Sequence, residues 1–353
     1  MAASNFSGNQ YRVGLGIRDH SSQALGSGTT SVDAVTEMKL ATVNDIAWDG
    51  AFQTATVAKS GRRAYLNQDY ISQYGSGVWT WDFDYLADDQ FICQKLLHLI
   101  NPVTADGNSA AVSTTIASNP LVNDLSKGAA GSFDTTADIL IVAPIIPASG
   151  GIEDEDRLMQ SAVLQNLTIA CDVGTDGGRP HMTGQFMTGF KPTISDSGVA
   201  LVAGIAGDEW DYSIFDLSTI TVCGVTSILK SFSITIDNPA TRVGWQGTSG
   251  ECDGYVRGGI VNITGSATVK LDTTTANLLS DWITSGAIGS PIDKATSVVL
   301  LENGSSWSIS LPSVLITGYS QDQAQDGIFV TIDFIATGGS TGALTSLAVI
   351  KMT

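Results

Sequence analysis

The segment 261–283 changes its hydrophobic period halfway along its length. From Val261 to Leu271 apolar and polar residues alternate, which is typical of a strand with one buried face. After Asp272 and three threonines, the apolar residues follow the spacing of one helix face: Leu278, Leu279, Trp282 and Ile283. We therefore expect a strand that leads directly into a short helix, with Thr273 or Thr274 as the helix N-cap.

A second unit of the same kind lies in the first third of the chain, at 76–100. Its strand begins with the alternating sequence "VWTWDF" at Val78. Asp88 and Asp89 then stand where a helix is expected to start. The apolar face of this helix comprises Phe91, Ile92, Leu96, Leu97 and Ile100. The strand–helix unit is thus predicted to occur twice.

The surroundings of the two units also match, because each follows a strand and a long connection and precedes further strands. We therefore predict an internal duplication, with chance similarity between two β segments as the alternative. The expected organisation is an N-terminal arm at 1–32, a first β domain at 33–198, a linker at 199–221 and a second β domain at 222–353. An Ala-, Ser- and Asn-rich stretch at 101–138 is expected to be an extra loop of the first domain.

Composition supports a mainly β fold and restricts the partners. Of 353 residues 43% are hydrophobic but only 15% are charged, so Ser, Thr, Asn and 38 glycines must cover much of the surface. The 35 acidic residues outnumber the 17 basic ones, and the formal charge of −18 should repel nucleic acid and anionic membranes. We expect neither a secretory signal at the start nor a membrane span in the apolar run 138–148, which two prolines interrupt.

The sequences "SFSITIDNPATRVG" and "GGIVNITGSATVKLD", followed by a short helix, resemble the tail tube proteins of long-tailed, siphovirus-type bacteriophages. The resemblance is best over 222–338 and weaker over 35–190. It implies two tandem β-sandwich domains, each with one short flanking helix. It also implies a structural, non-enzymatic virion protein, made in the host cytoplasm, whose rings stack into the tube that conducts DNA during ejection.

The resemblance also implies the partners. They are other copies of the chain, joined edge to edge around a channel, other tail proteins, and passing double-stranded DNA that is not bound specifically. No cofactor and no membrane are expected. If a usual ring of this family has six single-domain subunits, three chains with two domains each would supply the same six domains. We therefore expect a homotrimeric, pseudo-hexameric ring, with six chains as the alternative. The candidate subunit contacts, with solvated surface as the alternative for the arginines, are Arg62, Arg63, Arg242, Trp79 and Trp245.

Rival readings remain at this stage. Another virion part, such as a tail terminator or a capsid decoration protein, shares almost all of these features. A carbohydrate-binding, adhesin-type β protein would instead use Trp79, Trp245 or Trp307 to stack on sugar, although core or interface packing is the more usual role of such residues.

Motifs that suggest chemistry are weak. "GGSTG" at 338–342 resembles a nucleophile elbow around Ser340, but all three histidines lie upstream and a strand is expected to follow, so we expect a hairpin turn. "IEDEDR" at 152–157 is expected to be a solvated loop, and "DVGTDGG" at 172–178 a hairpin turn rather than a calcium site. The four cysteines have no paired spacing and are expected to be free and buried. No catalytic, cofactor-binding or metal-binding residue is therefore predicted.

Overall fold

The computed structural model shows a mainly β protein, as predicted. It describes residues 11–19, 35–40, 42–49, 53–56, 70–73, 77–100, 113–117, 123–126, 135–142, 156–194, 201–202, 212–244, 251–257, 261–273, 275–276, 296–302, 307–324, 327–337 and 346–352. Across these ranges, no helix is both long and apolar enough to cross a lipid bilayer.

A central antiparallel sheet of eight strands runs through both halves of the chain. Its order is β3 (Ala47–Asp49), β6 (Val78–Leu86), β11 (His181–Thr188), β10 (Arg157–Asp172), β16 (Leu229–Asp237), β19 (Asn262–Lys270), β22 (Gly327–Ala336) and β21 (Trp307–Ala324). The described pairings join β3 only to β6, and residues 315–324 of β21 only to β22. Within the described residues, no further strand therefore pairs with β3 or with residues 315–324 of β21, the two ends of this strand order.

Two flanking sheets complete the fold. The first has the order β13 (Leu201–Val202), β2 (Val35–Met38), β1 (Arg12–Asp19), β9 (Thr135–Val142), the start of β10, and β12 (Thr193–Ile194). The second has the order β15 (Val225–Thr226), β14 (Leu217–Val222), β20 (Thr296–Glu302), the start of β21, β23 (Ser346–Met352) and β7 (Ser113–Ala117). All these pairings are antiparallel except that of β13 with β2.

Each long strand belongs to two sheets, and each changes sheet through irregular pairing. In β10 the register with β9 shifts between Met159 and Ala162, around Ser161, whose φ of 50° is unusual for a residue with a side chain. The register with β11 shifts just after Leu164. In β21 the register with β22 shifts between Ile316 and Gly318. Such bulges bend a strand, so one strand is able to serve both layers.

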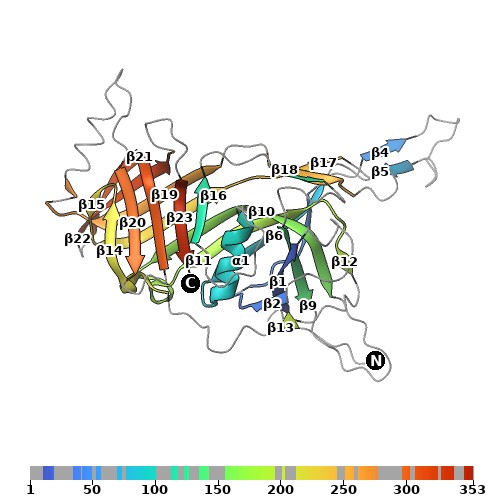
Figure 1. Cartoon of the computed structure of the whole chain (residues 1–353), viewed down its shortest axis with the longest axis horizontal. Helices are drawn as coiled ribbons and strands as arrows, with labels where there is room; N and C mark the ends of the chain where they lie inside the picture. The colour runs from blue at the N-terminus through green and yellow to red at the C-terminus, as the bar shows by residue number, and fades with distance from the viewer. Residues whose placement is uncertain are drawn as a thin grey trace, which may run out of the picture.

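The pairings of the first half recur in the same order in the second. β3–β6–β11–β10 is matched by β16–β19–β22–β21, and β2–β1–β9–β10 by β15–β14–β20–β21. Each half also has a hairpin between the first two of its central strands: β4 (Gln53–Thr56) with β5 (Tyr70–Gln73), and β17 (Thr241–Val243) with β18 (Gly254–Arg257). In Figure 1 the first half lies toward one end of the long axis and the second half toward the other.

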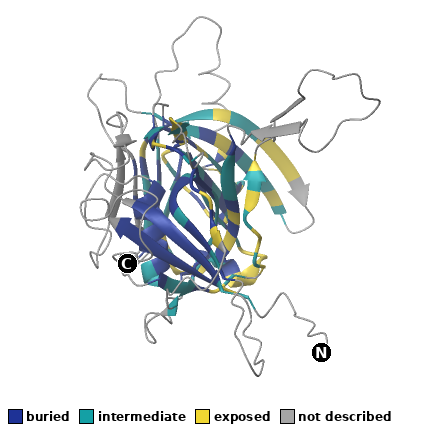
Figure 2. Ribbon diagram, turned by 90° about the vertical axis from the view of Figure 1, so that its right-hand side faces the viewer, coloured by how far each residue is buried: buried dark blue, intermediate teal, exposed yellow. Residues whose placement is uncertain are grey.

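The main core lies between the central sheet and the flanking sheets and is shared by both halves. Trp81 from the first half and Trp307 from the second are both only 1% exposed. The buried segments gather in the middle of the molecule (Figure 2). Helix α1 (Gln90–Ile100) packs against β10 and also contacts β23 of the second half (Figure 1). Burial of apolar surface is the main stabilising term, and here it joins the two halves into one body.

The start of α1 agrees with the sequence prediction. The Asp89 carboxylate accepts hydrogen bonds from the amides of Phe91, at 2.7 Å, and Ile92, at 3.3 Å, which is the geometry of a helix N-cap. Lys95 is buried rather than solvated, and its ammonium donates to the Leu15 carbonyl and the Thr36 hydroxyl. The helix is thereby tied to the first flanking sheet.

The strand of the second unit is confirmed as β19, but the predicted N-cap is wrong. The Asp272 carboxylate accepts from the Thr275 amide at 2.9 Å, and the Thr275 hydroxyl accepts from the Asp272 amide at 2.7 Å. The Ala276 amide donates to the Asp272 carbonyl, so Asp272 occupies the position that was assigned to Thr273 or Thr274. The helix predicted after these residues lies outside the described part of the chain.

Three predicted boundaries differ from the structure. The arm expected at 1–32 contains β1, whose Val13, Leu15 and Ile17 are buried in the core. The linker expected at 199–221 contains most of β14. The loop expected at 101–138 contains β7 and β8 (Asn123–Ser126), which pair with β23 and β18 of the second half. These strands were missed because a strand is stabilised by partners distant in sequence, which local composition does not show.

Candidate functional site

The second face of the central sheet, opposite the core, is mainly polar; its apolar residues include Val78, Met187, Phe329 and Ile335. Alternation along each strand places the buried apolar residues on one face and the polar residues on the other. We call this second face the polar face. Its carboxylates are Asp49, Asp82, Asp84, Asp172, Asp237, Asp322 and Asp333. The described strands add Lys230, Lys270 and His181, so the polar face is strongly acidic.

Cross-strand hydrogen bonds hold many of these side chains. The hydroxyls of Thr168 and Thr235 are 2.9 Å apart, and those of Thr268 and Thr331 are 3.0 Å apart. The Gln185 amide donates to the Asp82 carboxylate at 2.8 Å. Such pairs stabilise a sheet by up to about 1 kcal/mol each. The polar face is therefore an ordered surface of hydroxyl and carboxylate groups.

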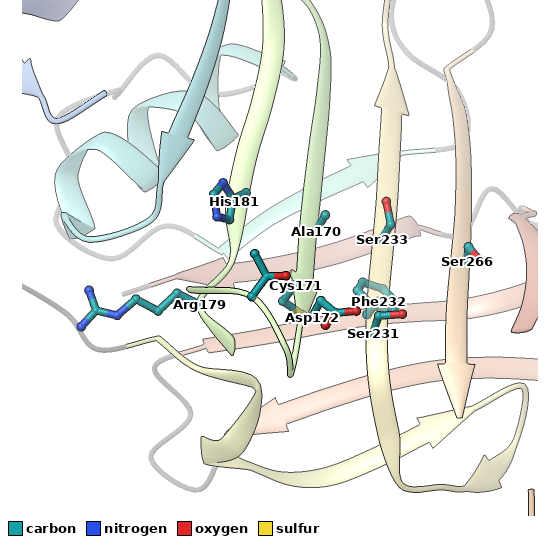
Figure 3. A pocket seen from close by; sticks show the side chains of 10 residues that line it. Ala170, Cys171, Asp172, Arg179, His181, Ser231, Phe232, Ser233 and Ser266 are labelled. Atoms are coloured by element: carbon teal, nitrogen blue, oxygen red, sulfur yellow. The ribbon is translucent and has the colours of Figure 1, made fainter. Parts of the chain in front are cut away.

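Two open hollows lie on the polar face. One, of about 360 Å³, is bordered by Asp172, Arg179, His181 and the serines Ser231, Ser233 and Ser266. Figure 3 shows Ser231 of β16 next to Asp172 of β10, Ser233 further along β16, and Ser266 on the next strand, β19. The other, of about 530 Å³, lies nearer β3 and is bordered by residues that include Asp49 and Arg242. Both hollows are open to one side, unlike the enclosed sites of small-molecule ligands.

His181 is the titratable group with the most specific surroundings on this face. Its Nδ1 lies 3.0 Å from Asp84 Oδ1, and its Nε2 lies 2.7 Å from Asp176 Oδ2. Burial on its own lowers the pKa of the imidazole, but the hydrogen bonds to Asp84 and Asp176 and their negative charges outweigh burial and raise that pKa above its ordinary value of 6.5. His181 at the start of β11 thus links Asp84 of β6 to Asp176 in the β10–β11 turn.

We expect the His181 cluster to stabilise the fold in a pH-dependent way. Because the pKa is raised in the folded state, the stabilisation is complete below about pH 6.5 and is lost as the pH rises through the folded-state pKa. The side chains are partly exposed, so its size is about 1 kcal/mol or less. Urea unfolding of the wild type and of His181→Gln at pH 6 and pH 8.5 measures it. A stability difference between the two proteins that fails to shrink at pH 8.5 contradicts this account.

The described residues do not form a nucleophile–base pair around His181. Cys171, which borders the same hollow, points into the core, and burial raises the pKa of its thiol to about 12, so it is not a thiolate at neutral pH. All four cysteines are free and buried, as predicted. Throughout the described ranges, no group of three or more His, Cys, Asp or Glu side chains is placed to hold a metal ion.

The weak motifs fall into turns and strands where they are described. Asp172 and Asp176 stand in the β10–β11 hairpin, where the Asp172 carboxylate accepts from the Gly174 amide at 2.7 Å, so the hairpin prediction is confirmed. All of "GGSTG" lies outside the described residues, and strand β23 follows it in the chain, as expected. Most of "IEDEDR" is likewise outside the description, although Asp156 is buried rather than solvated.

The predicted contact residues are only partly placed. Arg242 is half-buried, and its Nη1 donates to the Gly77 carbonyl at 2.7 Å, so it supports the fold as well as bordering a hollow. Trp79 is half-buried against Trp48 of β3, with ring centroids 4.9 Å apart. Arg62, Arg63 and Trp245 lie outside the described residues. Trp307, offered for sugar stacking, is in the core, so that role is excluded.

The sequence reasoning missed Arg257, which joins the two halves at the β10–β16 junction. Its guanidinium is buried and donates to the carbonyls of Leu164, at 2.7 Å, and Asn238. It also reaches the Leu99 carbonyl in the last turn of α1, where a cation is favoured. Burial lowers its pKa to about 9, so it remains charged at neutral pH. A lone arginine at the end of a strand gives no sequence signal for this role.

Comparisons with known proteins add no identification. No protein-family model matches the sequence, and a search of curated proteins gives no significant match.

Proposed function

We propose that this chain is a self-assembling structural protein whose copies form hollow rings, stacked into the tail tube of a long-tailed bacteriophage. One observation carries the proposal. The central sheet repeats the same four-strand order in each half, and the two halves meet strand to strand, at β10 and β16. A sheet built this way is able to continue into a further copy at each end, and closing it into a ring removes its exposed edges.

We propose further that the two halves are repeats of one ancestral domain. The matching order of pairings, the hairpin at the same place in each half and the double role of β10 and β21 all support this. Three chains then supply six domains, so the ring is a trimer with pseudo-sixfold symmetry. β7 and β8, which lie between α1 and β9 in the first half, pair with β23 and β18 of the second.

The composition of the polar face suits the lining of a channel for DNA. If the sheet closes with this face inward, the wall presents aspartates and hydroxyl groups, whereas a basic wall would bind each passing phosphate. Double-stranded DNA then passes without being held. The remaining surface of each copy is left for stacking and for other tail proteins.

The rival functions have less support. A sugar-binding protein needs accessible aromatic rings over a groove, but Trp81 and Trp307 are buried, and Trp79 packs on Trp48. A tail terminator or a capsid decoration protein also forms rings or covers a lattice, and remains the second candidate. It differs from a tube protein in that its rings do not polymerise with one another.

Negative-stain electron microscopy of the purified protein, with its mass measured by light scattering, tests the proposal. Stacked hollow rings are the expected result. Single rings that never stack favour the terminator, and a uniform monomer at all concentrations contradicts self-assembly.

A further inference from the structure

We propose that β3 of one copy pairs antiparallel with β21 of the next copy, in the same register as the internal β10–β16 junction. The inference rests on the proposed self-assembly and adds its interface. In this register Asp49 lies opposite Gly318 of the next copy, Trp48 opposite Tyr319, and Ala47 opposite Ser320. The partner is therefore a second copy of this chain.

The register follows from the pairings within each half. In β21, Gly318 is the first residue paired with β22 after the bulge, and it lies opposite Asp333. In β10, Asn166 is the first residue paired with β11 after the bulge, and it lies opposite Gln185. β21 in the second half thus corresponds to β10 in the first, with Gly318 in the place of Asn166.

On the other side, β3 corresponds to β16. Ser266 of β19 lies opposite Asp333, and Asp82 of β6 lies opposite Gln185. Ser266 and Asp82 therefore occupy matching places in the two halves. Four residues before Ser266, Asn262 pairs with Asp237 of β16. Four residues before Asp82, Val78 pairs with Asp49 of β3. Asp49 therefore takes the place of Asp237.

The internal junction then gives the pairing between copies. There Asn166 lies opposite Asp237, Leu167 opposite Ile236, and Thr168 opposite Thr235. Replacing each residue by its counterpart in the other half gives Gly318 with Asp49, Tyr319 with Trp48, and Ser320 with Ala47. The strands run antiparallel, as β10 and β16 do.

Burial on the two end strands is compatible with a further strand beside each of them. Inside the chain, Leu167, Ile234 and Ile236 are buried on the core side of the junction. Their counterparts on the end strands, Tyr319, Ile46 and Trp48, are apolar or aromatic but only half-buried. On the polar side, Ala47 and Ser320 are exposed, whereas Thr235 and Thr168 are half-buried. The end strands thus present an apolar row that a second copy would cover, with a gain of about 25 cal/mol for each Å².

The charges at this interface are compatible with pairing. Continuing the register by two residues brings Asp322 opposite Asp45 of the next copy. Asp45 already forms an ion pair with Arg157 of its own copy, and the positive charge of Arg157 offsets the repulsion between Asp45 and Asp322. At the other end of the ladder Gly318 brings no charge toward Asp49.

Cysteine cross-linking tests the register directly. At the internal junction the hydroxyls of Thr168 and Thr235 are 2.9 Å apart, so cysteines at the corresponding Ser320 and Ala47 would approach bonding distance. The full-length double variant Ser320→Cys with Ala47→Cys, assembled and then oxidised, is expected to form covalent oligomers on a denaturing gel. The native cysteines are buried, so the wild type serves as the blank.

Two further variants make the result specific. Thr168→Cys with Thr235→Cys is the positive control and should close within one chain. Asp322→Cys with Asp49→Cys places both cysteines on the polar face but four residues out of register, about 13 Å apart at the rise of a strand. Its yield of covalent oligomers should be roughly tenfold lower or less, because a disulfide does not span that distance.

Each outcome decides the matter. Oligomers from the matched pair alone support the interface. Rings by electron microscopy without cross-linking of the matched pair overturn the register while leaving the proposed function intact. A protein that stays monomeric and cross-links only in the positive control overturns both.

Discussion

Replacing Asp138 with alanine is expected to destabilise the protein by about 3–5 kcal/mol, because it leaves a buried guanidinium without its carboxylate. Asp138 on β9 and Arg18 on β1 are 2% and 0% exposed, and their two hydrogen bonds measure 3.0 and 2.7 Å. Asp138 also accepts from the Ser161 amide at 3.1 Å, at the point where β10 changes sheet. Loss of this carboxylate should therefore loosen the first flanking sheet as well. The midpoint of urea unfolding measures the effect.

A matched control is provided by the other ion pair of β1. Arg12 and Glu37 also form two hydrogen bonds, at 2.7 and 2.6 Å, but their side chains are 51% and 28% exposed. Glu37→Ala should cost about 1 kcal/mol or less. If Asp138→Ala does not fold, the double variant Arg18→Met with Asp138→Leu should recover a folded protein, since removing both charges avoids the unpaired one. Equal costs for Asp138→Ala and Glu37→Ala would contradict the account.

Replacing Trp81 with alanine is expected to cost about 3–5 kcal/mol, which is the usual range for a large buried aromatic residue. Trp81 is 1% exposed, lies 5.7 Å from the Phe83 ring and 6.1 Å from the Phe186 ring, and donates its indole N–H to the Asn44 carbonyl at 3.0 Å. The deletion opens a cavity beneath β6 and β11. It also removes a contact that holds the segment leading into β3. Calorimetry or urea unfolding measures the loss.

Trp79 is the control for this substitution. It lies two residues earlier on the same strand and so on the same side of the sheet, but it is half-buried and packs on Trp48. Trp79→Ala should cost about 0.5–1.5 kcal/mol, the usual contribution of an aromatic pair. We expect it to weaken assembly more than folding, because Trp48 belongs to the proposed interface. A Trp79→Ala protein as unstable as Trp81→Ala would show that the end of the sheet is already complete in the monomer.

Local patterns predicted the elements well. The alternation at 261–271 gave β19, and the two aspartates after β6 gave the start of α1. The pattern around the two hairpins gave β10 with β11 and β21 with β22. These features depend on residues close together in sequence, where the strand and helix periods are directly visible.

What depends on distant residues was not predictable. β1 was taken for part of an N-terminal arm, although its Val13, Leu15 and Ile17 alternate with Gly14 and Gly16. In fact Gly14 has no room for a side chain, since a Cβ there would lie 2.1 Å from Leu201. The crossing of β10 and β21 between sheets, and the pairing of β7 and β8 with the second half, follow from tertiary contacts alone.

The sequence showed that the chain is acidic, but not which strands carry the polar face. We expected copies joined edge to edge, but the sequence did not show which strands would lie at the ends of the sheet. The polar face follows from the pairing of eight strands, and its carboxylates come from both halves of the chain. The arginines and tryptophans proposed as contacts were selected by residue type, and of those described, Arg242 bonds to its own chain.

The central claim is that each copy contributes two equivalent segments to a ring and that the β10–β16 junction is repeated between copies. The rotational symmetry of the ring, from electron cryomicroscopy of the assembled protein, tests it most directly. We expect three chains per ring, six similar domains and a sheet that continues from β21 of one copy into β3 of the next. A ring of six chains, or one in which β3 and β21 do not meet, would contradict the account.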